Sequence, residues 1–235
     1  MMKLSLVIPC YNEEKNLPLI VERFAAGLTR SDIELVLVNN GSRDNSQAVL
    51  DRLAPAYPFV RTALVEVNKG YGFGIRAGLN VARGEYVGWT HADMQTDPND
   101  AVRALEIIEQ RGAPKNIYLK GLRKGRSALD LFFTVGMSCF ESIYLHVRLW
   151  DINAQPNIFH RSFLEAWENP PDDFSLDLYA LYLARRSGLD VVRFAVVFPP
   201  RIHGTSTWNT GIGAKWKFIK RTLDFSVRLK KELQQ

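Results

Sequence analysis

Three polar side chains stand at alternate positions directly after a short apolar run, and together they have the chemistry of a metal site. The run spans 85–90 and is typical of a buried strand. His91, Asp93 and Gln95 follow it, and a turn comes next at Asp97-Pro98. Open α/β sheets bind ligands just beyond the carboxyl ends of their strands. Carboxylate and amide oxygens there can hold a hard divalent cation and, through it, a diphosphate. The alternative is a strand followed by an ordinary turn.

A glycine-rich segment also suggests nucleotide chemistry, but of a different kind. Gly72, Gly74 and Ala77 fit the degenerate dinucleotide pattern G-x-G-x-x-A, and Asp93 lies about 20 residues further on. That pattern normally occupies the first strand–helix turn, whereas here it opens the third predicted helix. We therefore disfavour a nicotinamide or flavin enzyme and expect these glycines to permit close helix packing.

Short apolar runs alternate with helix-like periodic segments through the first half of the chain. The predicted strands are 4–9, 33–38, 60–67, 85–90 and 117–120, and the helices between them begin near residues 13, 44, 70 and 99. The third helix is expected to end near Arg83, with Gly84 in the C-terminal cap position. The alternation predicts βαβ units in an α/β fold, with a mostly parallel sheet flanked by helices.

The second half of the chain is less regular. It contains a long apolar helix at 128–147, a loop at 151–161, a helix at 174–186, a strand at 191–198 and a final helix at 213–233. We predict a catalytic domain at 1–211 and a C-terminal amphipathic helix at 212–235. This helix either belongs to the same domain or extends it onto a membrane surface.

Composition favours a soluble globular protein. Hydrophobic residues make up 46% of the 235 residues and charged residues 23%. Only two cysteines are present, Cys10 and Cys139, which disfavours a disulfide scaffold and fits a reducing compartment. There is no signal-peptide pattern and no run of about 18 apolar residues. We expect a cytoplasmic protein, with a peripheral position on the inner face of the membrane as the alternative.

The net charge of +5 is concentrated in the C-terminal segment. From Arg201 onward eight basic residues stand against two acidic ones, so this segment carries +6 and the first 200 residues about −1. Apolar and basic residues of the final helix fall on opposite arcs of a helical wheel, as in an interfacial helix. An anionic partner such as lipid headgroups or phosphates would suit this pattern. In the alternative interpretation, the apolar arc packs on the catalytic domain and the lysines face water.

Five sequence blocks occur in an order that resembles family 2 glycosyltransferases, and in layout the polyprenyl-phosphate sugar synthases. They are 6–13, 36–44, 68–84, 91–98 and the later Arg201-x-x-Gly204-x-Ser206. Their order and spacing, over residues 4–206, make chance agreement improbable. The resemblance implies the GT-A fold, which is Rossmann-like, and sugar transfer from a nucleotide-sugar with the help of Mg²⁺ or Mn²⁺.

The resemblance also implies which residues bind the donor nucleotide. They are Pro9, Tyr11 and Glu13, then Asn39, Asn40 and Gly41, then Lys69, Arg76 and Ala92. Tyr11 can stack on a base, and Lys69 or Arg76 can neutralise phosphate. The family usually has two aspartates where this chain has Asn39-Asn40. Asparagine keeps an acceptor and loses the charge, so the base specificity is open.

The family's Asp-x-Asp position is occupied here by His91-Ala92-Asp93, with the first aspartate replaced. By the resemblance, Asp93 becomes the principal metal ligand and Gln95 the second. His91 is either a third ligand or a neighbour of the site, because imidazole prefers softer metals than magnesium. Asp93 is also the first candidate for a catalytic role, together with Arg201.

The acceptor side of the site departs from the family pattern. The resemblance implies that Arg123, Arg126, His203 and Ser206 bind the acceptor or a phosphate. Transfer to an alcohol needs a general base, for which Asp151, Asp173 and Asp177 are the candidates. A phosphate acceptor is already ionised and needs none.

These features lead to one main hypothesis and two alternatives. The main hypothesis is an inverting, metal-dependent glycosyltransferase that acts on a polyprenyl phosphate or a lipid-linked saccharide. The first alternative acts on a soluble or polysaccharide acceptor in cell-surface glycan synthesis. The second is a degenerate nucleotide-binding protein without transfer activity. No nucleic-acid partner is expected, and the oligomeric state is open.

Overall fold

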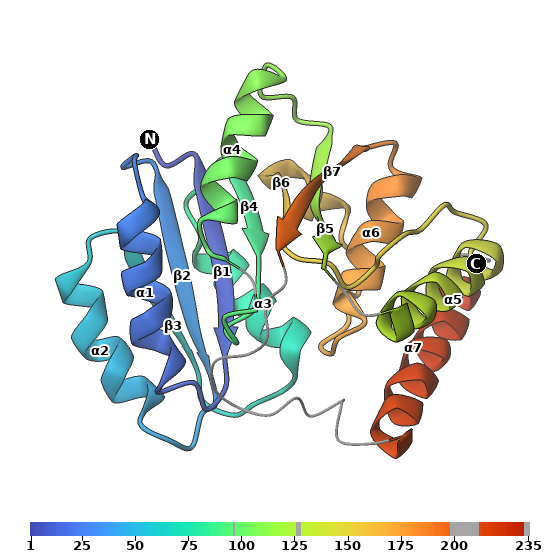
Figure 1. The fold of residues 1–235 in the computed structure, drawn as a ribbon, viewed down its shortest axis with the longest axis horizontal. Helices are drawn as coiled ribbons and strands as arrows, with labels where there is room; N and C mark the ends of the chain where they lie inside the picture. The colour runs from blue at the N-terminus through green and yellow to red at the C-terminus, as the bar shows by residue number, and fades with distance from the viewer. Residues whose placement is uncertain (96, 126–127, 198–211, 233–235) are drawn as a thin grey trace.

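A seven-stranded sheet organises the chain in the computed structural model, which describes residues 1–95, 97–125, 128–197 and 212–232 (Figure 1). The strands are β1 (Leu4–Cys10), β2 (Ile33–Asn40), β3 (Val60–Val65), β4 (Tyr86–Trp89), β5 (Ile117–Lys124), β6 (Asn157–His160) and β7 (Asp190–Val197). The helices are α1 (Asn16–Gly27), α2 (Ser46–Ala56), α3 (Tyr71–Val81), α4 (Asp100–Gln110), α5 (Ala128–Tyr144), α6 (Leu176–Arg186) and α7 (Ile212–Glu232), with a 3₁₀ turn at Arg161–Ala166. The sheet order is β3-β2-β1-β4-β6-β5-β7.

All neighbouring strands are parallel except at β6. This strand runs antiparallel to both of its neighbours, with Phe159 opposite Val87 of β4 and Tyr118 of β5. The loop predicted at 151–161 is therefore wrong over its second half, because 157–160 forms an interior strand of the sheet. The strand is only four residues long, and two of its buried residues, Asn157 and His160, are polar. Such a segment carries little strand signal.

Helices cover both faces of the sheet because the central strands are apolar on both sides, as a parallel sheet requires. On one face Leu17 of α1, Leu50 of α2 and Leu105 of α4 pack in a single core cluster. On the other face Ile75 of α3 and Leu178 of α6 belong to a second cluster. The predicted α/β fold with a mostly parallel sheet flanked by helices is confirmed.

Helix α3 approaches the sheet closely because glycines stand beside Ile75 and Leu79 on its buried face. A Cβ atom on Gly78 would lie 2.3 Å from a methyl group of Val7 and 2.8 Å from one of Val38. The expectation of close packing is thus met. The expected cap is wrong, however, since α3 ends at Val81 and Ala82, not Gly84, is its C-terminal cap residue. Gly84 serves another close approach, because its Cβ would lie 2.5 Å from the Ser5 backbone nitrogen.

Helices α5 and α7 lie side by side at one end of the molecule (Figure 1). Phe225 and Leu229 of α7 are buried in the second core cluster, while Val227 is 41% exposed. For Phe225 and Leu229, the structure agrees with the interpretation that the apolar arc of the final helix packs on the domain. Within the described residues, no helix is long and apolar enough to span a bilayer.

Candidate nucleotide and metal site

The loops that follow β1 and β2 are joined by backbone-to-side-chain hydrogen bonds. The backbone N–H of Asn12 donates to the Ser42 hydroxyl at 3.0 Å, and the N–H of Arg43 donates to Oδ1 of Asn12 at 2.8 Å. The N–H of Glu13 donates to the Ser46 hydroxyl at 3.0 Å. Two blocks that lie about 30 residues apart in sequence therefore form one surface at the carboxyl edge of the sheet.

The loop that follows β3 joins the same surface through glycine backbone. Gly41 has a φ of +72°, and a Cβ there would lie 2.4 Å from the backbone nitrogen of Asn68. The side-chain amide of Asn40 donates to the Gly70 carbonyl at 3.0 Å. The first three sequence blocks of the resemblance therefore converge at one edge.

The residues predicted to bind the nucleotide differ in how they can reach a ligand. Tyr11 is 43% exposed, so its ring is available to stack on a base. Glu13 is half-buried and accepts from the Asn16 amide at 2.5 Å, and Pro9 is also half-buried. Asn39 is buried and donates to Gln47 at 2.8 Å. Ala92 is buried in the first core cluster.

The two cations predicted to neutralise phosphate have different surroundings. Lys69 is exposed, with its ammonium group 4.9 Å from the centre of the Phe73 ring. Arg76 is paired with the Asp172 carboxylate at 2.6 Å and also donates to the Pro170 carbonyl. Arg76 therefore holds the 170–172 segment against α3, and Lys69 is the more accessible of the two cations.

The predicted metal ligands follow β4 at the same edge. Asp93 is 9% exposed and accepts from the backbone N–H of Gln95 at 3.1 Å, while His91 and Gln95 are half-buried. Within the described residues, no group of three or more His, Cys, Asp or Glu side chains is placed to hold a metal ion. The hard donors at this position are therefore the carboxylate of Asp93 and the amide oxygen of Gln95. Two oxygen donors are few for a divalent cation.

An aromatic stack stands beside this metal block. The ring of Tyr71, at the start of α3, lies 4.5 Å from the stacked Phe174 ring and 5.6 Å from the His91 ring. Burial raises the pKa of the Tyr71 hydroxyl well above its ordinary value, and the charges of Asp177 and Asp93 add to this shift. Tyr71 therefore stays protonated and can donate a hydrogen bond.

A buried polar network supports the stack from behind. The Asp177 carboxylate, 2% exposed, accepts from the indole N–H of Trp89 at 3.0 Å and from the amides of Gln155 at 2.9 Å and Asn157 at 3.0 Å. Gln155 also donates to the Tyr71 hydroxyl at 3.3 Å. The network ties β4, β6 and α6 together behind the metal block.

Lys120 is the basic residue of this buried network. Its ammonium group donates to the Ala154 carbonyl at 2.8 Å and to Oδ1 of Asn157 at 2.5 Å. Complete burial lowers the pKa of Lys120 to about 7, against the opposing effect of the Asp177 charge. A buried amine with these partners fixes the turn before β6 in place.

Among the candidate bases, the structure separates Asp173 from the other two. Asp151 is 3% exposed and forms an ion pair with Arg123, and hydrogen bonds from Arg123 keep the pKa of its carboxyl below the ordinary value despite burial. Asp177 is enclosed by its three donors. Asp173 is half-buried and accepts from the Ser175 backbone N–H at 2.8 Å. The roles predicted for Asp151 and Arg123 stay predictions.

Four predicted residues lie outside the described part of the chain. They are Arg126, Arg201, His203 and Ser206. Conversely, sequence reasoning missed Tyr71, Phe174, Gln155 and Lys120. A lysine inside an apolar strand, and an Asn-x-Gln-x-Asn run at 153–157, were the signals that pointed to a buried polar network.

The geometry defines an α/β protein whose ligand edge is formed by the loops after β1, β2, β3 and β4. Residues 5–119, just under half of the chain, match the sequence profile of the family described as Glycosyl transferase family 2. The resemblance noted from the sequence is confirmed.

The curated relatives match in the same region. The undecaprenyl-phosphate 4-deoxy-4-formamido-L-arabinose transferase of Yersinia enterocolitica is 36% identical over 112 residues, which make up 46% of this chain and 34% of the relative. The transferase of the same name from Sodalis glossinidius is 38% identical over 112 residues, with the same two shares. The chain thus matches about a third of the length of these relatives.

Solved structures extend the likeness over most of the chain. A mannosyltransferase from Pyrobaculum calidifontis, in complex with GDP-Man and Mn²⁺, has a TM-score of 0.64 at 16% identity and covers 86% of this chain and 58% of its own. Glucosyl-3-phosphoglycerate synthase from Mycobacterium tuberculosis, in complex with Mn²⁺, UDP and phosphoglyceric acid, has a TM-score of 0.66 at 17% identity, with coverages of 87% and 72%. These similarities confirm the GT-A fold.

Proposed function

We propose that the chain transfers a sugar from a nucleotide-sugar to the phosphate of a polyprenyl phosphate, with a divalent cation bound at Asp93. The observation that carries the proposal is the convergence of four loops at one sheet edge, all within the segment that matches the family profile. The names of the curated relatives, which are undecaprenyl-phosphate sugar transferases, support this class of acceptor.

The donor set fits a hard cation that is held partly by its substrate. Asp93 supplies a carboxylate and Gln95 an amide oxygen, and Mg²⁺ is commonly bound through one or two carboxylates plus substrate phosphates. The Mn²⁺ bound in structurally similar transferases supports the same type of ion. When bound, such an ion supplies Lewis-acid stabilisation of the departing diphosphate.

The residues of the chain itself would orient the donor. Tyr11 would stack on the base, and Glu13 would accept hydrogen bonds from base or ribose donors. Lys69, which is exposed, would lie near the diphosphate. The Tyr71 hydroxyl stays protonated and would donate a hydrogen bond on the sugar side.

The chemistry of the acceptor decides whether a base is needed. A phosphate monoester is already ionised at neutral pH and can attack the anomeric carbon without losing a proton. A hydroxyl acceptor requires a base, and Asp173 is the most accessible of the three candidates. Asp173→Asn should therefore leave transfer to a polyprenyl phosphate nearly unchanged. If the acceptor is a hydroxyl, the same change should lower transfer to that acceptor about 100-fold or more.

Two measurements test the proposal. The unfolding temperature of the protein is measured with GDP, UDP, CDP or dTDP, each in the presence of Mn²⁺. It should rise for one of these nucleotides, because a ligand that binds only the folded state stabilises it. Transfer from the matching nucleotide-sugar to undecaprenyl phosphate is then followed by mass spectrometry. Absence of both nucleotide binding and donor hydrolysis would favour the degenerate, inactive protein. Hydrolysis without transfer to the lipid would favour a soluble acceptor.

A further inference from the structure

Helix α5 turns an uncharged apolar face to solvent. Phe132 is 70% exposed and Ile143 75%, although side chains of this size are usually buried in a soluble domain. Between them on the same side of the helix lie Gly136 and the exposed Cys139, and a Cβ built on Gly136 would meet no atom within 4 Å. We name Phe132, Val135, Gly136, Cys139, Phe140 and Ile143 the α5 face.

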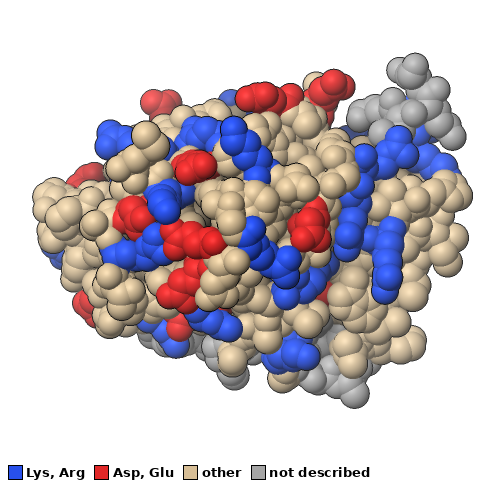
Figure 2. All heavy atoms as spheres, turned by 90° about the horizontal axis from the view of Figure 1, so that it is seen from above, with Lys and Arg blue, Asp and Glu red and all other residues tan. Residues whose placement is uncertain are grey.

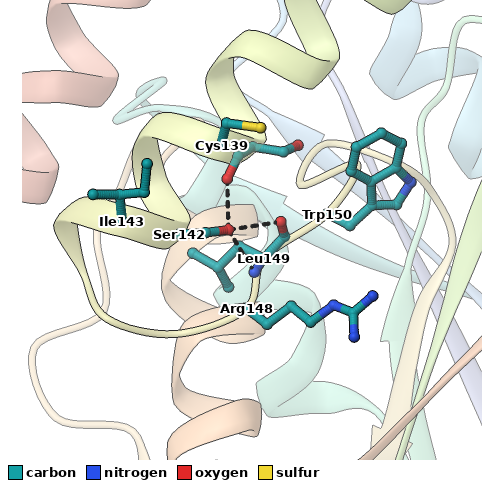
Figure 3. Close-up of a pocket in the computed structure, with 7 residues that line it drawn as sticks. Cys139, Ser142, Ile143, Arg148, Leu149 and Trp150 are labelled. Carbon is teal, nitrogen blue, oxygen red and sulfur yellow. Dashed lines mark hydrogen bonds between the residues drawn. The ribbon is translucent and has the colours of Figure 1, made fainter.

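A shallow pocket continues the α5 face on one flank. Its volume is about 310 Å³, and its walls are Cys139 and Ile143 of α5 together with Arg148, Leu149 and Trp150 (Figure 3). The Ser142 hydroxyl fixes this wall, because it accepts from the backbone N–H of Leu149 at 2.9 Å, as the dashed lines in Figure 3 show. Trp150 is 40% exposed, which adds an aromatic edge to the apolar surface.

Helix α7 borders the α5 face on the other flank, and basic residues stand on both flanks. The Lys230 ammonium donates to the Tyr144 carbonyl at 3.0 Å, which holds α7 beside α5. The exposed basic residues are Arg148, Lys220, Arg228 and Lys231, with Asp224 as an exposed acidic neighbour. Lys and Arg side chains gather toward this end of the molecule, beside surface that carries no charge (Figure 2).

We infer that the α5 face docks on an anionic lipid bilayer, with α5 lying in the plane of the interface and the basic residues on lipid headgroups. An apolar helix face flanked by cations has the composition of an interfacial helix. This assigns the membrane contact to α5 rather than to α7, whose Phe225 and Leu229 are already buried in the domain. The inference rests on the proposed function, since a bilayer is where a polyprenyl phosphate resides.

Flotation with vesicles tests the inference. The full chain should float with vesicles of phosphatidylcholine and phosphatidylglycerol and much less with phosphatidylcholine alone. The double variant Phe132→Ser/Ile143→Ser should reduce binding at least about tenfold, from the apolar area that it no longer buries. The matched control is Leu64→Ser/Val67→Ser, which removes apolar side chains of similar exposure, 60% and 67%, near the β3 edge and should bind like wild type. Changing Arg148 or Lys220 to Gln should weaken binding about fivefold for each.

The two cysteines allow a direct test of insertion. Cys10 is fully buried and Cys139 is exposed on the α5 face, so a thiol-reactive, environment-sensitive dye should label Cys139. Its emission should shift to shorter wavelength on vesicles. A dye attached in the control variant Cys139→Ser/Val67→Cys should show no shift.

Three outcomes would overturn the inference. These are no flotation of the wild type, unchanged flotation of Phe132→Ser/Ile143→Ser, or a concentration-dependent dimer that this variant abolishes. The last result would make the α5 face an interface between two copies of the chain. Transfer to a short, water-soluble prenyl phosphate separates this inference from the proposed function. Such transfer without vesicle binding defeats only the docking, and vesicle binding without any transfer defeats only the function.

Discussion

The hydroxyl of Ser226 on α7 donates a 2.7 Å hydrogen bond to Oε2 of Glu141 on α5, and both residues are completely enclosed. The other carboxylate oxygen of Glu141 has no hydrogen-bond partner among the described residues. Burial raises the pKa of this carboxyl from near 4.5 to about 7, against the lowering effect of the Ser226 hydrogen bond. The contact between the two helices is therefore sensitive to pH.

The sign of this effect follows from where the proton is held. The unfolded chain releases it near pH 4.5 and the folded chain near 7, so the free energy of unfolding falls as pH rises through this interval. Glu141→Gln should remove that part of the slope and make the protein more stable at pH 8, by up to about 3 kcal/mol. Urea unfolding at pH 5 and pH 8 measures it, with the exposed Glu106→Gln as control. Parallel slopes for wild type and Glu141→Gln would contradict the prediction.

Removing the carboxylate charge at Asp93 should abolish transfer while the fold stays intact. We expect Asp93→Asn to lose much more than tenfold in kcat/KM, where tenfold corresponds to ~1.4 kcal/mol of transition-state stabilisation. Gln95→Ala should lose less, because an amide is the weaker ligand. Steady-state kinetics with Mn²⁺, together with thermal unfolding, check both. An Asp93→Asn enzyme within about tenfold of wild type would exclude Asp93 as the main ligand.

Replacing His91 by aspartate distinguishes its two possible roles. If His91 is a metal ligand, His91→Asp should keep or raise Mn²⁺-dependent activity, because it restores a second carboxylate. The measurement is kcat/KM as a function of Mn²⁺ concentration. Complete loss of activity in a folded variant would assign a specific role to the imidazole, whose ring lies 5.6 Å from that of Tyr71. His91→Asn serves as the uncharged control.

A single methyl group should disturb the packing of α3 on the sheet. In Gly78→Ala the new Cβ would lie 2.3 Å from a Val7 methyl group, and the overpacking should cost about 1–3 kcal/mol. Gly136→Ala is the matched control, because it is also a helix-interior change but meets open space. This control should be neutral or stabilising by up to about 1 kcal/mol. Equal urea midpoints for the two variants would show that α3 adjusts without cost.

The sequence predicted most of the fold in the first half because each strand there is a continuous apolar run between clear turns. Asn12 and Ser42 were placed in the right loops by their position after strands. The pairing of Arg76 with Asp172 could not be predicted from local sequence patterns, because 96 residues separate them in sequence. The same holds for Arg123 and Asp151, which sequence reasoning assigned to two separate roles. Both ion pairs join residues that are far apart in sequence, and neither periodicity nor turn chemistry identifies such pairs.

The position of strand β6 limits how chimeras of this chain with a relative can be made. The family segment contributes β1 to β4 and the start of β5, yet β6 comes from the later part of the chain and lies between β4 and β5. The start of β5 therefore has no hydrogen-bonded neighbour from its own segment, since its two partners are β6 and β7. A chimera that takes its second half from a relative must also import a strand that fits between two strands of the first. The two halves of the chain are therefore expected to fold, and to fail, together.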